Sequence, residues 1–69
     1  MCYVIYKKTE EDGDHPVCFL FDKSTATWFA ELIELEDDVE CAIVPLPYIE
    51  AKRQRIIYFE KVLDQYASE

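Results

Sequence analysis

Three cysteines and one histidine are the residues of this chain whose chemistry best suits metal binding or nucleophilic catalysis. Cys2, Cys18, Cys41 and His15 together have the composition of a tetrahedral zinc site with three thiolates and one imidazole. A thiolate activated by the imidazole would instead form a Cys–His nucleophilic pair. Each cysteine, however, stands inside an apolar run typical of a strand, where it behaves as a small hydrophobic residue, and no CxxC spacing occurs. We therefore expect no metal, no cofactor and no disulfide framework.

The sequence also lacks the motifs of the common enzyme classes. Its single glycine, Gly13, leaves no material for a glycine-rich phosphate loop or a nucleophile elbow. The acidic run from Glu10 to Asp14 shares only its composition with a calcium-binding loop, because the alternating ligand positions and the closing glutamate are missing. A solvated carboxylate does not acquire the shifted pKa that general acid catalysis requires. We expect a protein without enzymatic activity and without catalytic residues.

Carboxylates are the most concentrated functional groups of the chain. The formal net charge is −8, and residues 9–51 hold twelve of the fifteen acidic residues but one basic residue, Lys23. A surface with this charge repels nucleic acids and anionic membranes and attracts basic partners. The same charge also keeps an apolar domain soluble, and the sequence is compatible with both roles. The candidate partner-binding residues form a central cluster and a turn cluster: Glu31, Glu34, Glu36, Asp37, Asp38 and Glu40, and Glu10, Glu11, Asp12 and Asp14.

The central cluster places six carboxylates in the ten residues from Glu31 to Glu40, with no basic residue among them. Carboxylates on a helix and an adjoining turn lie a few ångström apart, a spacing that imitates the phosphates of a nucleic acid. We therefore predict a protein-binding inhibitor whose acidic surface occludes the basic nucleic-acid-binding site of a host protein. The small size, acidity, aromatic content and lack of catalytic motifs are similar to those of phage- or mobile-element-encoded inhibitors of the anti-CRISPR or anti-restriction type. This resemblance of composition assigns no role to any residue.

The basic cluster Lys52-Arg53-Gln54-Arg55 is too small to reverse this expectation. The acidic bulk of the domain opposes the approach of a nucleic acid over a Debye length, so no direct binding of nucleic acid is predicted. We expect these cations to pair with neighbouring acids such as Glu50, or to cross a dimer interface.

The positioning elements are predicted from periodicity. Runs rich in β-branched and aromatic residues indicate strands at residues 2–8, 17–22 and 40–44. A turn is expected over residues 9–16, with Asp12-Gly13 as its pivot. Helices are expected from a Ser24 or Thr25 N-cap to about residues 35–38, and from residue 47 or 48 to about residue 67. The buried stripe of the first helix is expected at positions 28, 29, 32, 33 and 35. The chain is therefore predicted to be one α+β domain, residues 1–69, with a three-stranded antiparallel or mixed sheet and two helices on one face.

Two features favour an alternative function. The first two strands are apolar on both faces, so one sheet face is left for a partner or a second copy of the chain. The last predicted helix has a wide apolar stripe, in which Ile57, Tyr58 and Val62 form a candidate dimer seam. The alternative to an inhibitor is therefore a structural or assembly homodimer, or a small subunit, acting through its apolar sheet face and C-terminal helix.

The N-terminal residues Met1-Cys2-Tyr3 lead directly into a strand-like run, so no signal peptide is predicted. No apolar stretch approaches the roughly 20 residues that span a bilayer. An odd number of cysteines suits reduced thiols. We expect a cytoplasmic location, in the host cell if the protein is phage-encoded.

Overall fold

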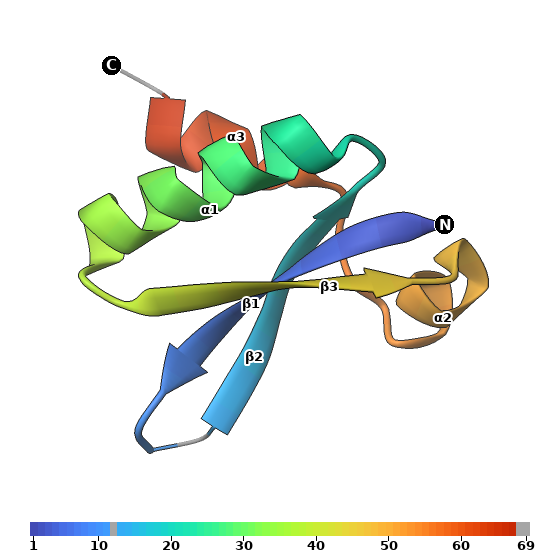
Figure 1. Cartoon of the computed structure of the whole chain (residues 1–69), viewed down its shortest axis with the longest axis horizontal. Coiled ribbons are helices and arrows are strands. Elements are labelled where there is room, and N and C mark those ends of the chain that lie inside the picture. Colours follow the sequence, from blue (N-terminus) through green and yellow to red (C-terminus); the bar gives the residue numbers. More distant parts are fainter. Residues whose placement is uncertain (12, 68–69) are drawn as a thin grey trace.

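The computed structural model describes residues 1–11 and 13–67, and over these residues the chain forms three strands and three helices. Strands β1 (Cys2–Thr9), β2 (Gly13–Leu20) and β3 (Glu40–Leu46) form an antiparallel sheet in the order β2-β1-β3. The helices are α1 (Lys23–Asp37), α2 (Tyr48–Arg53) and α3 (Phe59–Ala67). The predicted α+β class with its three-stranded sheet is confirmed (Figure 1).

The central position of β1 explains why this strand is apolar on both faces. Ile5 belongs to the core cluster on one face of the sheet, and the neighbouring Val4 belongs to a second cluster on the other face. Successive side chains of a strand point to opposite faces, so a strand buried on both sides reads as a continuous apolar run. Gly13, with φ of 78°, opens β2 in a conformation that glycine adopts without strain.

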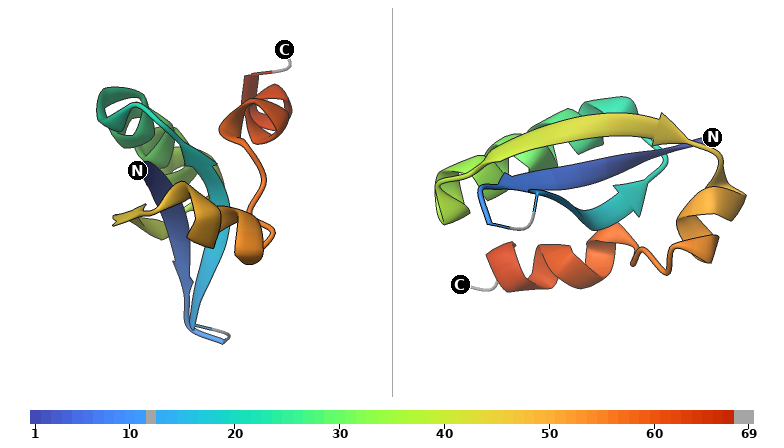
Figure 2. Two further views of the ribbon diagram at one scale, coloured as in Figure 1. Left: turned by 90° about the vertical axis from the view of Figure 1, so that its right-hand side faces the viewer. Right: turned by 90° about the horizontal axis from the view of Figure 1, so that it is seen from below.

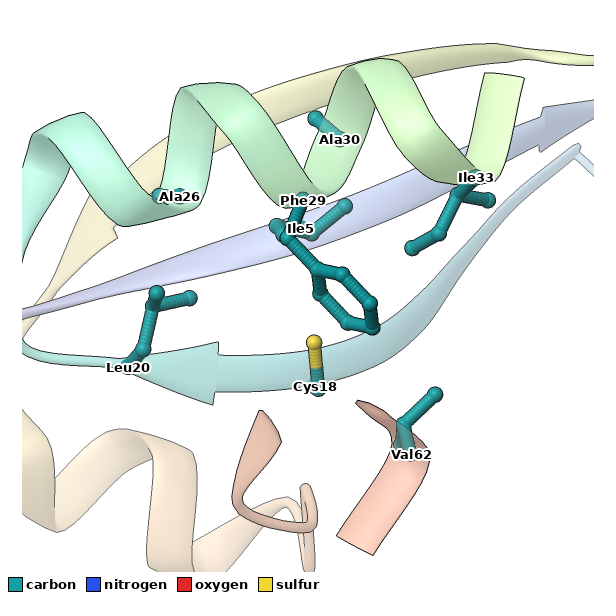
Figure 3. Packing of buried hydrophobic residues seen from close by; sticks show 8 residues of the cluster. All are labelled: Ile5, Cys18, Leu20, Ala26, Phe29, Ala30, Ile33 and Val62. Atoms are coloured by element: carbon teal, nitrogen blue, oxygen red, sulfur yellow. The ribbon is translucent and has the colours of Figure 1, made fainter. Parts of the chain in front are cut away.

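The main core lies between one face of the sheet and the two helices α1 and α3. Its buried residues come from β1, β2, α1 and α3. Helix α3 lies alongside the β2 edge of the sheet (Figure 2). A cluster of this kind stabilises the domain because each large apolar side chain contributes about 1.5–3 kcal/mol when it leaves water. The buried members are Ile5, Cys18, Leu20, Ala26, Phe29, Ala30, Ile33 and Val62 (Figure 3).

The opposite face of the sheet is covered by α2 and the segment that follows it. Ala51 and Ile56 pack there against Cys2, Val4 and Phe19, and all five residues are buried. The face that the sequence left for a partner or second copy is therefore filled, at this end of the sheet, by the chain itself.

The single helix expected over residues 47–67 is divided into α2 and α3. At the end of α2, Arg55 N–H donates to Lys52 O (3.0 Å) and Ile56 N–H donates to Ala51 O (3.0 Å). These two bonds, with Arg55 at φ of 59°, form a Schellman motif that ends the helix. The Ile-Ile-Tyr run then continues in extended form, because β-branched and aromatic residues favour that conformation. Phe19 N–H of β2 donates to Ile57 O (2.9 Å), which anchors the segment to the sheet edge.

The N-cap of α1 lies two or three residues earlier than expected. Asp22, and neither Ser24 nor Thr25, is the N-cap residue. Its Oδ2 accepts hydrogen bonds from the backbone N–H of Thr25 (2.8 Å) and from the hydroxyl of Thr25 (2.6 Å). A carboxylate at this position also complements the positive end of the helix dipole, which a serine hydroxyl does not.

The buried face of α1 is rotated from the predicted stripe. Two alanines let the helix approach the sheet closely, and their methyl groups take the place that the prediction gave to larger side chains. Trp28 and Leu35, expected to be buried, are 51% and 83% exposed. The residues that α1 buries are Ala26, Phe29, Ala30 and Ile33.

Among the described residues, no helix combines the length and the apolar character needed to cross a bilayer.

Candidate functional site

The last residues of the central cluster and the described residues of the turn cluster meet at one end of the sheet. Lys8, near the end of β1, pairs with Asp14 of β2 on one side and with Glu40 of β3 on the other. The strand pairing therefore places Asp14 of the turn cluster at the same end of the sheet as the connection from α1 to β3 (Figure 1). We call the four carboxylates that line the intervening depression the acidic end: Glu10, Glu11, Asp38 and Glu40.

The depression at the acidic end is open to solvent and has a volume of about 750 Å³. Lys8 and His15 also line it, so its wall contains four carboxylates and one lysine. The four carboxylate residues are exposed. Of the predicted turn cluster, Asp14 lies on β2 near this depression, and Asp12 lies outside the described residues.

Asp38 occupies a backbone position that does not favour a carboxylate. It ends α1 in the left-handed conformation, with φ of 53° and ψ of 47°. Aspartate tolerates this conformation better than most residues do, but glycine and asparagine are the usual occupants. An acid at a helix C-terminus also opposes the dipole, at about 0.3–1 kcal/mol. An acidic residue at position 38 is therefore unfavourable for the stability of α1.

Asp37 is used within the fold. Its Oδ2 accepts hydrogen bonds from Lys7 Nζ (2.7 Å) and from the Tyr66 hydroxyl (2.7 Å). These bonds connect the end of α1 to β1 and to α3. The hydrogen bond from Lys7, followed by that from Tyr66, lowers the pKa of Asp37. Burial, followed by the hydrogen bond to Asp37, raises the pKa of Tyr66, which stays protonated as the donor.

Glu34 protects the outer edge of β3. Its Oε2 accepts the backbone N–H of Cys41 (3.0 Å), which therefore points away from β1. Pro45, an even number of residues further along, stands on the same side and has no N–H to leave unpaired. A charged side chain and a proline are standard means of protecting an edge strand from pairing with another chain. The predicted binding role of Glu34 thus coincides with a structural one.

The remaining two carboxylates of the central cluster, Glu31 and Glu36, are exposed on α1. Five residues of α-helix correspond to a rotation of about 140° between them. Glu31 precedes Glu34, which reaches β3, by about one turn. Glu36 follows Phe29, whose ring contacts rings of α3, by about two turns. The six carboxylates of the central cluster therefore do not form one continuous surface.

The cysteines are distributed over both faces of the sheet. Cys2 belongs to the cluster under α2, whereas Cys18 and Cys41 stand on the α1 side, on the two strands that flank β1. Two strand spacings alone separate their backbones by about 9–10 Å, and Cys18 and Cys41 also pair with β1 residues two positions apart, so a disulfide is out of reach. Burial, followed by the charge of Cys41, raises the pKa of Cys18 to about 12. Burial, followed by the charge of Glu34, likewise raises the pKa of Cys41.

Within residues 1–11 and 13–67, no three His, Cys, Asp or Glu side chains come together in an arrangement that could hold a metal ion.

The candidate dimer seam is not displayed on one helix face. Val62 is buried in the main core, and Ile57 and Tyr58 precede α3 in the extended segment. The ring of Tyr58 packs at 5.4 Å from that of Phe19, and Ile57 remains 45% exposed. The alternative surface that was expected on the C-terminal helix is therefore largely internal.

A different apolar surface lies at the α2 end, which sequence reasoning missed. Phe21, Tyr48 and Ile49 are 54%, 43% and 65% exposed, and the rings of Phe21 and Tyr48 lie 5.6 Å apart. Lys52 Nζ lies 5.5 Å from the centre of the Tyr48 ring, a cation–π contact. Together with Arg53, these residues form what we call the aromatic end. The signal in the sequence that could have indicated this surface is Pro47, which fixes the start of α2, a helix too short to bury all of its apolar side chains.

Searches against known protein families, curated protein sequences and solved structures found no match for this chain.

Proposed function

We propose that this protein is a non-enzymatic protein-binding domain whose acidic end docks on a basic surface of its partner. In its sharper form, the partner is a host protein, and the docked domain occludes a basic site that otherwise holds nucleic acid. The observation that carries the proposal is the convergence of two acidic segments, far apart in sequence, around one open depression. A concave acidic surface fits a convex basic one, such as an exposed helix or loop rich in lysine and arginine.

Electrostatics supports a role in partner recognition. Four exposed carboxylates at one end of a small domain create a negative potential that extends over a Debye length of about 8 Å at physiological ionic strength. Such a field accelerates association with a basic surface and repels acidic ones. The position of Asp38 adds weight, because its charge is retained where the helix dipole and the backbone conformation both disfavour it.

The proposal is tested by competition with nucleic acid. The partner is isolated from the host by affinity to the intact protein, and a fluorescent oligonucleotide bound to that partner is then titrated with the protein. Displacement of the oligonucleotide is expected, with an inhibition constant raised at least tenfold in the double variant Asp38→Asn/Glu40→Gln. The double variant Glu60→Gln/Asp64→Asn, which changes exposed residues of α3 by the same charge, serves as the control. Equal inhibition by all three proteins would disprove the role of the acidic end.

A second candidate function, assembly into a homodimer or a larger complex, is favoured by the aromatic end. Three large apolar side chains exposed near one another on a domain of this size are typical of an interaction surface. In this case Ile49→Asp abolishes association, while Asp38→Asn/Glu40→Gln leaves it unchanged. Sedimentation velocity of the three proteins separates this function from the first.

A further inference from the structure

Large apolar side chains follow one another along the solvent side of α1. Trp28 and Leu35 are 51% and 83% exposed, and Leu32 between them is partly buried. These positions, i, i+4 and i+7, fall in a line, because seven residues complete almost two turns and rise about 10.5 Å. We call the three residues the outer stripe. Their spacing is that of the anchor residues with which a helix enters an apolar groove of another protein.

The outer stripe is rigid before any partner arrives. The opposite face of α1 is fixed in the core by Phe29 and Ile33, and its N-terminus is capped by Asp22. The Trp28 ring stacks on the Phe29 ring, with 6.0 Å between centroids and 29° between planes. A preformed helix loses little conformational entropy on binding, whereas a free peptide would have to fold. Tryptophan is also the residue most enriched among the energetic hot spots of interfaces.

Carboxylates flank the outer stripe on both sides. By helix geometry Glu31 lies on the side of Glu34, which reaches β3, and Glu36 lies on the side of Phe29, which contacts α3. Asp38 of the acidic end follows about one turn after Leu35. The stripe and the acidic end are therefore continuous along α1. A complementary surface has an apolar floor for the three anchors and a rim of lysine or arginine side chains.

We propose that the outer stripe is the apolar anchor of this protein, inserted into a cation-rimmed apolar groove of the partner protein. The inference rests on the proposed function, because it assigns the stripe to the partner that the acidic end binds. Charge disfavours the other occupants. A second copy would bring Glu31 and Glu36 of each chain against like charges, and an anionic membrane would be repelled in the same way.

The test uses a defined probe, a labelled 14-residue amphipathic peptide of leucine and lysine that presents one apolar face rimmed by cations. Binding is expected to shift the emission of Trp28, the only tryptophan of the chain, to shorter wavelength. The anisotropy of the label then gives the Kd for each variant. We expect Leu35→Ala to raise the Kd about tenfold and Trp28→Ala about thirtyfold. Ile49→Ala, which removes a 65% exposed side chain from the aromatic end, should change the Kd less than twofold.

The outcomes separate this inference from the function on which it rests. If the stripe variants bind like the wild type while Asp38→Asn/Glu40→Gln binds weakly, the acidic end stands and the apolar anchor is wrong. If only the stripe variants bind weakly, the anchor stands and the acidic end is wrong. Equal binding of a leucine–glutamate peptide would show that the apolar groove needs no cationic rim and would contradict that part of the inference. A Trp28 emission that shifts with protein concentration alone would make a second copy the occupant and overturn the inference.

Discussion

Asp38→Asn should make the protein more stable while weakening its binding. Asparagine keeps the side-chain shape and tolerates the left-handed backbone that Asp38 adopts, so the change removes little except the charge. Relief of the unfavourable helix-dipole interaction is worth about 0.3–1 kcal/mol. For a domain of 60–100 residues, 1 kcal/mol corresponds to about 4–8 °C in Tm, so a rise of about 1–8 °C is expected.

Thermal unfolding followed by circular dichroism measures this change. The gain should shrink in about 1 M salt, where the Debye length falls to about 3 Å and the dipole interaction is screened. Asp38→Ala is the control, since it removes the same charge but places a residue with no left-handed preference at φ of 53°. That variant should lose the gain or fall below the wild type. A lower Tm for Asp38→Asn than for the wild type would refute the reasoning, because it would show that the carboxylate stabilises the fold.

Three further predictions concern the fold that supports the site. Asp37→Asn should cost about 0.2–1 kcal/mol by weakening the exposed contact with Lys7. Because the pKa of Asp37 is lowered by folding, this contribution is complete above about pH 4 and is lost as the pH falls through the lowered value. Denaturant unfolding between pH 2 and pH 7 should therefore show a free energy of unfolding that falls less steeply toward acid pH in the variant than in the wild type. An equal pH dependence in the two proteins would contradict this. Arg55→Gly should stabilise the protein by about 0.5–1 kcal/mol, since glycine suits φ of 59°, and a loss of stability would mean that the arginine makes a contact that compensates for the strain. Phe29→Ala should cost about 3–5 kcal/mol and Leu35→Ala less than about 0.5 kcal/mol, which urea denaturation of the two variants measures. A large loss of stability in Leu35→Ala would show that Leu35 is a core residue.

The sheet could be predicted from the sequence because its signals are local. Both strands of the hairpin are rich in β-branched and aromatic residues, and Gly13 stands at the turn, where a positive φ is needed. Apolar residues on both faces of β1 also indicated that each side of the sheet is covered. What covers the second face could not be predicted, since it depends on a tertiary hydrogen bond from Phe19 to the segment after α2.

The buried face of α1 was mispredicted for a physical reason. A pattern of large apolar residues gives little weight to alanine, yet Ala26 and Ala30 are the residues that let the helix lie close to the sheet. Counted with Phe29 and Ile33, they recur at spacings of three and four and would have identified the correct face. With the correct face buried, Trp28 and Leu35 lie on the exposed side of α1, where they form the outer stripe with Leu32.

The acidic site was predictable in composition and unpredictable in arrangement. Sequence reasoning found both clusters, but their convergence depends on the register that sets Lys8 opposite Glu40. It also could not separate carboxylates that face a partner from those that bond within the chain. Asp37 and Glu34 belong to the second kind, because Tyr66 and the backbone of Cys41 donate to them.

The central claim, that the acidic end steers the protein onto a basic partner, is tested most directly by association kinetics. The rate constant for binding to the isolated partner is measured by stopped-flow between 50 mM and 500 mM salt, for the wild type, Asp38→Asn/Glu40→Gln and Glu60→Gln/Asp64→Asn. We predict that the first double variant lowers the rate constant about tenfold at low salt and flattens its dependence on ionic strength, while the second follows the wild type. Identical rates and salt slopes for all three proteins would contradict the claim.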